Sequence, residues 1–114
     1  MSCTLNTLYQ IPYIIKSLAD TYTNGKVMMF GGGGYNIWKV VPRAWSHVFL
    51  ALIEAPPPQG QLPSQWLEKW QPYATCTLPK HWQDDKENYI DIPREEEITA
   101  TNLKHAQQVI SWFK

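Results

Sequence analysis

The segment Lys26–Phe30, with the sequence KVMMF, is the one convincing β-strand in the sequence, and it limits what the chain can fold into. Its residues are continuously apolar after the lysine rather than alternating, which is typical of a strand covered on both faces, as in a parallel sheet. A strand needs neighbours on at least one edge. With 114 residues the chain is at most one domain. We therefore expect an α/β chain that forms a piece of a larger domain.

Helices are expected on both sides of this strand. Residues 7–22 place apolar side chains at helical spacing, and Thr4 or Asn6 is a suitable N-cap. Pro12 predicts either a kink or a helix that begins near it. Gly25 is expected to end the helix in the left-handed conformation. The expected apolar stripe is Leu8, Ile11, Ile15, Leu18 and Tyr22.

A second helix is predicted over Pro42–Ile53, with the proline in its first turn. Few polar residues interrupt this segment, so we expect the helix to be buried on more than one side. Its expected inner face consists of Trp45, Val48, Phe49, Leu52 and Ile53.

The composition changes after Ala55, where proline and glutamine become frequent. We expect an extended connection around a short helical turn at Ser64–Trp70. A last helix is predicted to start near Pro93. Three glutamates follow it, and the helix dipole favours acidic side chains in the first turns of a helix. The expected apolar stripe of this last helix is Ile98, Leu103, Ala106, Ile110 and Phe113. Residues 1–55 thus form one helix–strand–loop–helix unit, and residues 56–114 form a connection and helical extension of the same domain.

The charge balance gives no electrostatic case for binding nucleic acid or an anionic membrane. Ten basic and ten acidic side chains produce a pI near 6.8. No segment approaches the roughly 20 apolar residues of a membrane span. The N-terminus lacks the pattern of a signal peptide, and two cysteines make no disulfide framework. We expect a cytoplasmic protein. Cys76 has no basic neighbour closer than Lys80, so a catalytic thiol is not expected.

Four consecutive glycines, Gly31–Gly34, directly follow the expected strand and precede Tyr35. A phosphate-binding P-loop would need Lys and Ser/Thr after the glycines, and the dinucleotide fingerprint would need glycine at the position of Asn36. Two interpretations remain. The loop either only turns the chain, or it allows close approach of a ligand to the backbone. In the second case Tyr35 offers a hydroxyl donor to a carbonyl oxygen that gains charge during attack.

The stretch GGGGYNIWKVVPRAW resembles the last strand–loop–helix of the zinc-dependent histone deacetylase superfamily, and within it the bacterial acetoin-utilisation branch. The stretches MSCTLNTLYQIPYIIKSLADTY, LPSQWLEKW and IPREEEITATNLKHAQQVI are similar to the same branch. The resemblance therefore covers nearly the whole chain. Its spacing to Trp45 is one residue longer than the eukaryotic pattern, and VVPRAW replaces an ARCW-like ending, which fits the bacterial branch.

This resemblance implies a C-terminal piece of the three-layer arginase/deacetylase fold. In such enzymes a zinc ion and its bound water attack the acetyl amide of an acyl-lysine. The resemblance assigns Tyr35 the role of catalytic oxyanion donor. It assigns the lining of the narrow acyl pocket to Gly31, Gly32, Gly33 and Gly34.

The resemblance also implies what lies outside this sequence. The family's zinc ligands (an Asp and a His together, and a second Asp) and its paired histidines fall upstream of Met1. We therefore expect zinc in the full-length parent, no metal in this chain, and no activity of the isolated chain. The implied partners are an acetylated protein substrate or the missing N-terminal part of the deacetylase domain.

Other polar groups point to less specific roles. The stretch HWQDD offers His81, Asp84 and Asp85 as a metal cluster, but a solvated surface is the simpler interpretation. We expect His47 to be packed on an apolar helix and His105 to be solvated. A second hypothesis for the function is a non-catalytic interaction or assembly module, whose tryptophans pack against a partner or another copy of the chain.

Overall fold

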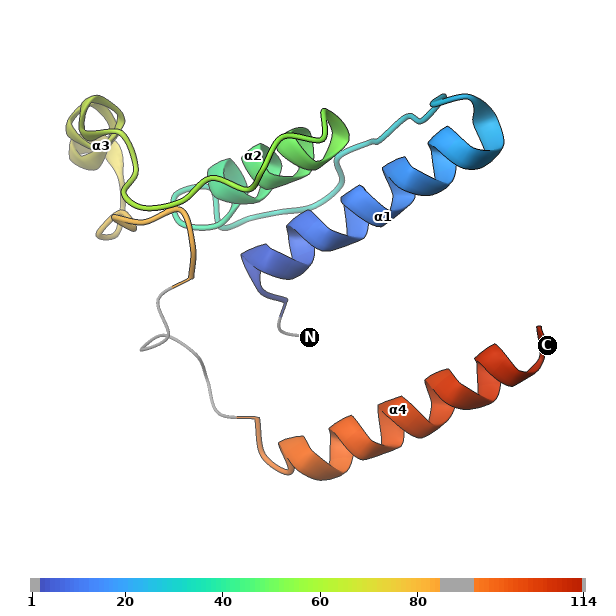
Figure 1. Ribbon diagram of the computed structural model, residues 1–114. Helices are drawn as coiled ribbons and strands as arrows, with labels where there is room; N and C mark the ends of the chain where they lie inside the picture. The colour runs from blue at the N-terminus through green and yellow to red at the C-terminus, as the bar shows by residue number, and fades with distance from the viewer. Residues whose placement is uncertain (1–2, 85–91, 114) are drawn as a thin grey trace.

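The computed structural model describes residues 3–84 and 92–113, in which helices are joined by irregular segments. The helices α1 (Leu5–Thr23) and α2 (Val41–Leu52) pack side by side. The short helix α3 (Ser64–Trp70) continues into the 3-10 helix η1 (Gln71–Tyr73). Helix α4 (Glu95–Ser111) lies apart from the other helices (Figure 1).

Helix α1 begins with the predicted cap Thr4, whereas its C-cap is Asn24, one residue before the predicted Gly25. The hydroxyl oxygen of Thr4 accepts a hydrogen bond from the backbone N–H of Thr7 at 3.2 Å, which satisfies one free donor of the first turn. At the other end Asn24 (φ 54°) and Gly25 (φ 76°) both adopt left-handed conformations. The helix continues through Pro12, so the alternative of a start near this proline is wrong.

The side of α1 that packs on the rest of the chain differs from the predicted stripe. Its buried residues are Leu5, Tyr9, Pro12 and Ala19. Most of the predicted apolar stripe is exposed, including Ile11, Ile15, Leu18 and Tyr22.

The predicted strand at Lys26–Phe30 is not formed. Residues 26–35 have no regular secondary structure, and the side chains of Met28 and Phe30 are 76% and 83% exposed. The only β-pairing among the described residues is an isolated antiparallel bridge between Gln61 and His81. A strand forms only against a partner edge, and no described segment provides one here. The described part of the chain is therefore mainly helical, and the expected α/β class is not confirmed.

Helix α2 has nearly the predicted bounds, with Pro42 in its first turn, but a different buried side. The prediction of its inner face is wrong for Trp45, Phe49 and Ile53, which are exposed. The side of α2 that packs on α1 and on residues 80–84 carries the guanidinium group of Arg43. This charged group can be buried because it finds hydrogen-bond acceptors there. The buried residues of α2 are Arg43, His47 and Ala51.

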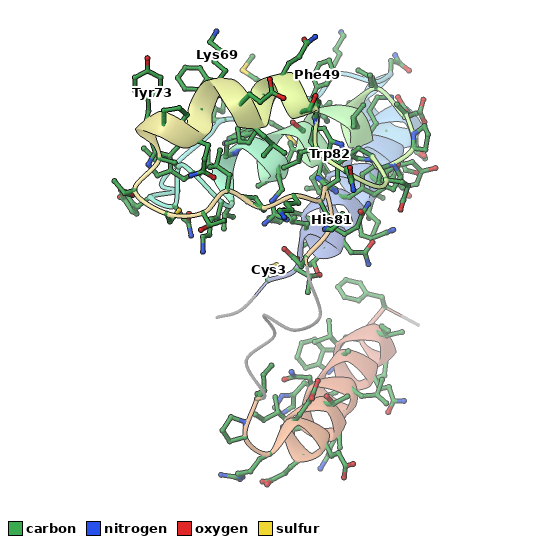
Figure 2. All side chains as sticks on the ribbon, turned by 90° about the vertical axis from the view of Figure 1, so that its left-hand side faces the viewer. Cys3, Phe49, Lys69, Tyr73, His81 and Trp82 are labelled. Carbon is green, nitrogen blue, oxygen red and sulfur yellow. The ribbon has the colours of Figure 1, made fainter. Side chains whose placement is uncertain are left out.

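A polar network joins α1, α2 and the segment after η1, which carries His81 and Trp82 (Figure 2). Nη1 of Arg43 donates hydrogen bonds to the backbone carbonyls of Gln83 at 2.8 Å and His81 at 3.2 Å. Nη2 of Arg43 lies 3.7 Å from a carboxylate oxygen of Asp84. The ring of His47 lies 6.5 Å from that of Trp82, centroid to centroid. These contacts fix α2 from the side opposite its exposed aromatic residues.

Helix α4 confirms the predicted start, since all three glutamates Glu95, Glu96 and Glu97 lie in its first turn. None of its described residues is buried, so its apolar stripe is uncovered. Within residues 3–84 and 92–113, no helix is long and apolar enough to cross a membrane.

Candidate functional site

The glycine loop lies between α1 and α2, on the irregular segment that leads into α2 (Figure 1). Gly33 has φ of 72° and Gly34 has φ of 88°. A side chain at either position would crowd the following carbonyl, which costs about 1–2 kcal/mol for ordinary residues. The backbone conformation alone therefore explains two of the four glycines.

Close packing against α2 explains the glycine at position 31. A Cβ atom on Gly31 would stand 2.6 Å from Cζ2 of Trp45, too close for any real contact. A Cβ on Gly34 would stand 3.1 Å from Cγ2 of Val41. A Cβ on Gly32 would meet no described atom within 4 Å. The loop thus lies directly on α2, and only Gly32 has no structural reason among the described residues.

Tyr35 projects from the end of this loop and is 93% exposed. No described residue forms a hydrogen bond with its hydroxyl group, which leaves the donor available to a ligand. The next residue is fixed to the start of α2. The side-chain Oδ1 of Asn36 accepts the N–H of Lys39 at 3.0 Å. The backbone carbonyl of Asn36 accepts the N–H groups of Val40 and Val41, each at 3.1 Å. The backbone on the C-terminal side of Tyr35 is therefore well defined.

The described residues do not fit a zinc ion. Across residues 3–84 and 92–113 no group of three His, Cys, Asp or Glu side chains is placed to hold a metal. In the candidate cluster of the stretch HWQDD, the carboxylate of Asp84 accepts the backbone N–H of Leu5 at 2.8 Å and lies beside Arg43. Asp85 lies outside the described residues. Ligands for the zinc that the resemblance implies are thus not found among the described residues.

The histidines of the helices lie as expected. His47 is 2% exposed, and its Nδ1 lies 2.8 Å from the carbonyl oxygen of Arg43. His105 is on the exposed surface of α4. Neither lies in the glycine loop.

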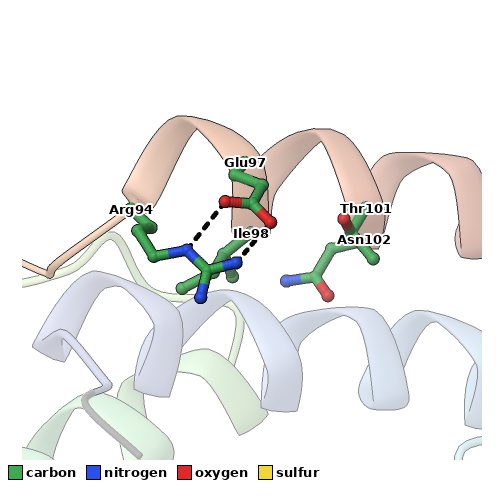
Figure 3. Close-up of a pocket in the computed structure, with 5 residues that line it drawn as sticks. All are labelled: Arg94, Glu97, Ile98, Thr101 and Asn102. Carbon is green, nitrogen blue, oxygen red and sulfur yellow. Dashed lines mark hydrogen bonds and ion pairs between the residues drawn. The ribbon is translucent and has the colours of Figure 1, made fainter.

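Hollows also lie away from the glycine loop in the described part of the chain. A groove of about 170 Å³ has Trp66 and Trp82 in its wall, but its one cation, Arg43, already donates to three backbone carbonyls. A hollow of about 240 Å³ on α4 is lined only by exposed residues of that helix and its cap (Figure 3). There the hydrogen bonds from Arg94 hold the pKa of Glu97 below its ordinary value. Neither hollow brings reactive groups together.

Sequence reasoning missed the buried link between Arg43 and the segment that contains Asp84. No local spacing connects two residues so distant in the sequence. The one available signal is an arginine within the otherwise apolar helix that starts at Val41, because a buried cation requires partners.

Comparison with known proteins points to one group of relatives. The chain is 77% identical over 114 residues to the acetoin utilization protein AcuC of Staphylococcus xylosus, covering 100% of this chain and 30% of the relative. It is 56% identical over 114 residues to AcuC of Staphylococcus aureus (strain MRSA252), again covering 100% of this chain and 29% of the relative. It is 38% identical over 110 residues to AcuC of Bacillus subtilis (strain 168), covering 96% of this chain and 28% of the relative.

The chain thus spans 28–30% of the length of these curated relatives and corresponds to part of an acetoin utilization protein. No family model matches the chain. No solved structure matches it.

Proposed function

We propose that the chain is the C-terminal part of an acetoin-utilisation-type protein deacetylase, in which Tyr35 donates a hydrogen bond to the acetyl-lysine carbonyl. The similarity to AcuC proteins over the full length of the chain supports this proposal, and so does the resemblance of the glycine–tyrosine motif. The observation that carries it is the placement of Tyr35. Its side chain is 93% exposed, while the loop before it and Asn36 after it are fixed to α2.

The chemistry follows from where charge develops. When water adds to the acetyl carbonyl, the oxygen becomes an oxyanion, and a phenol donor binds that oxyanion more tightly than the neutral carbonyl. A donor held by the backbone needs no reorganisation at the moment of reaction. In the resembled family the zinc ion supplies activation of the water, and in this proposal its ligands belong to residues of the longer protein outside the described ones. The role of this chain is to position the donor and the loop beside it.

We further propose that the rest of the longer protein covers the exposed apolar side of α1 and α2. Two observations support this partner. The relatives are more than three times as long as the region they share with this chain. Many large apolar side chains of α1, α2 and the segment between them are exposed, which soluble monomers avoid. They include Ile11, Ile14, Leu18, Met28, Phe30, Phe49 and Ile53. In the complete protein Lys26–Phe30 then pairs as a strand of an α/β sheet.

The same exposed surface favours a second candidate function, a non-catalytic interaction or assembly module. The two proposals differ in what they require of Tyr35. A docking surface needs the apolar side chains of α1 and α2, whereas a deacetylase also needs the phenol hydroxyl.

The test is a Tyr35→Phe variant of the full-length protein, which keeps the ring and removes the donor. We expect the kcat for an acetyl-lysine peptide to fall by roughly 10²–10³ with bound metal unchanged. Tyr73→Phe, which alters an exposed tyrosine on η1, is the matched control and should keep full activity. Full activity of Tyr35→Phe would remove this residue from the mechanism. A metal-loaded wild-type protein that hydrolyses no acetyl-lysine would favour the assembly module.

A further inference from the structure

The glycine loop touches α2 at points on both sides of Tyr35. Before the tyrosine, Gly31 lies against the indole of Trp45, and Gly34 lies against Val41. After it, Asn36 accepts the backbone N–H groups of residues 39–41, which lead into the helix and begin it. The loop therefore follows the surface of α2, and its position depends on the side chains that form this surface.

Trp45 is the largest of these side chains. It stands four residues after Val41, so both lie on the same side of α2. The outer edge of its indole makes the contact, with Cζ2 at 2.6 Å and Cη2 at 3.2 Å from a Cβ built on Gly31. The residue is 44% exposed, although tryptophan usually buries its large ring.

The helix behind this contact is itself held in place. Arg43 is 7% exposed on the other side of α2, and its guanidinium donates to the backbone carbonyls of residues 39, 81 and 83. A fixed helix with a rigid indole on its surface is a suitable support for a loop of glycines, which have no side chains to define their own position.

We infer that Trp45 is a positioning residue that sets the location of the Tyr35 hydroxyl through its contact with Gly31. This inference rests on the proposed role of Tyr35 as donor to the acetyl carbonyl. A donor to an oxyanion must lie within hydrogen-bond distance of it, and a displacement of about 1 Å costs up to roughly 10²-fold in rate. Trp45 does not touch the substrate; it acts through the loop.

A double-mutant cycle in the full-length protein tests this role. Trp45→Ala should lower kcat roughly 10- to 100-fold with little change in KM. The same substitution in a Tyr35→Phe background should lower kcat further by less than about 3-fold, because the group that it displaces is already absent. The control is Trp70→Ala, which truncates an exposed tryptophan at the end of α3 and leaves the loop contact intact. Equal losses of kcat in both backgrounds would overturn the inference.

Two further measurements separate this inference from the proposed function. Amide exchange of residues 31–36 should be faster in Trp45→Ala and unchanged in Trp70→Ala. Unchanged exchange in Trp45→Ala overturns the inference whatever the activity. Faster exchange combined with full activity of Tyr35→Phe refutes the proposed function and, with it, any catalytic role of the loop's position.

Size compensation gives the last measurement. Gly31→Ala should lower kcat, because its Cβ has no room beside the indole. Adding Trp45→Phe shortens the ring that it meets and should restore part of that loss. A double variant that is no better than Gly31→Ala alone would overturn the inference.

Discussion

A carboxylate oxygen of Asp84 accepts the backbone N–H of Leu5 at 2.8 Å, although 79 residues separate the two in the sequence. Leu5 is the first residue of α1, so the acceptor lies at the positive end of that helix. The other oxygen of the same carboxylate faces Arg43 of α2. One side chain thus joins the start of α1, the middle of the chain and the segment after η1.

Asp84→Ala should therefore destabilise the fold by about 1–3 kcal/mol, because the N–H of the buried Leu5 loses its acceptor. Urea unfolding followed by tryptophan fluorescence measures this loss. Asp20→Ala is the control, since Asp20 pairs with the nearby Lys16 on the surface of α1. Equal stability of the two variants would mean that the Asp84 contact contributes nothing.

Tyr9→Phe should destabilise the chain by about 0.5–1.5 kcal/mol. The hydroxyl of the buried Tyr9 donates to the backbone carbonyl of Ala55 at 2.9 Å and so ties α1 to the end of α2. The neighbouring Tyr13, whose ring stacks on Tyr9, is 42% exposed and provides the control Tyr13→Phe. Thermal unfolding of both variants should show a lower midpoint only for Tyr9→Phe.

The 114-residue chain should self-associate, because the apolar side of α1 and α2 is uncovered. Sedimentation over a concentration series should show a mass that rises with concentration. Leu18→Glu and Phe49→Glu should weaken this association, whereas Ser17→Glu, at an exposed polar position of α1, should not. A protein that stays monomeric at every concentration would contradict the predicted self-association.

The first turn of α4 should lose helicity in acid. Hydrogen bonds from Arg94 lower the pKa of Glu97 from its ordinary value of 4.5. Because the pKa is lower in the helix than in the unfolded chain, the stabilisation is fully present above about pH 4.5 and is lost as the pH falls through the folded pKa. Circular dichroism of a peptide of residues 92–114 should show the loss, and Glu97→Gln should reduce it. An identical pH profile for the variant would assign the effect to Glu95 and Glu96 alone.

The sequence was sufficient where structure depends on neighbours along the chain. Pro63 before the helix and the apolar spacing within it define α3 at Ser64–Trp70, as predicted. The glutamate run likewise marks the first turn of α4. Prediction failed where structure depends on a partner. The buried side of α2 follows from the partners of Arg43, and Lys26–Phe30 has no neighbouring strand among the residues that the structure describes.

The glycine loop shows the same division between what local rules explain and what a partner must explain. Gly33 is required by its φ of 72° and Gly31 by the indole of Trp45. Gly32 has neither reason, since its backbone is outside the left-handed region and no described atom lies within 4 Å of a Cβ at this position. If the loop only turned the chain, alanine would serve at position 32.

Gly32→Ala therefore separates the two interpretations of the loop. It should leave the free energy of unfolding unchanged or raise it by up to about 1 kcal/mol, because alanine restricts the unfolded chain. In the full-length protein it should nevertheless reduce kcat/KM for an acetyl-lysine peptide by at least about 10-fold, since a methyl group would occupy the space of an approaching acyl chain. Gly33→Ala, by contrast, should cost about 1–2 kcal/mol of stability through backbone strain alone. A Gly32→Ala protein with unaltered stability and unaltered kcat/KM would show that the loop does not line a substrate pocket.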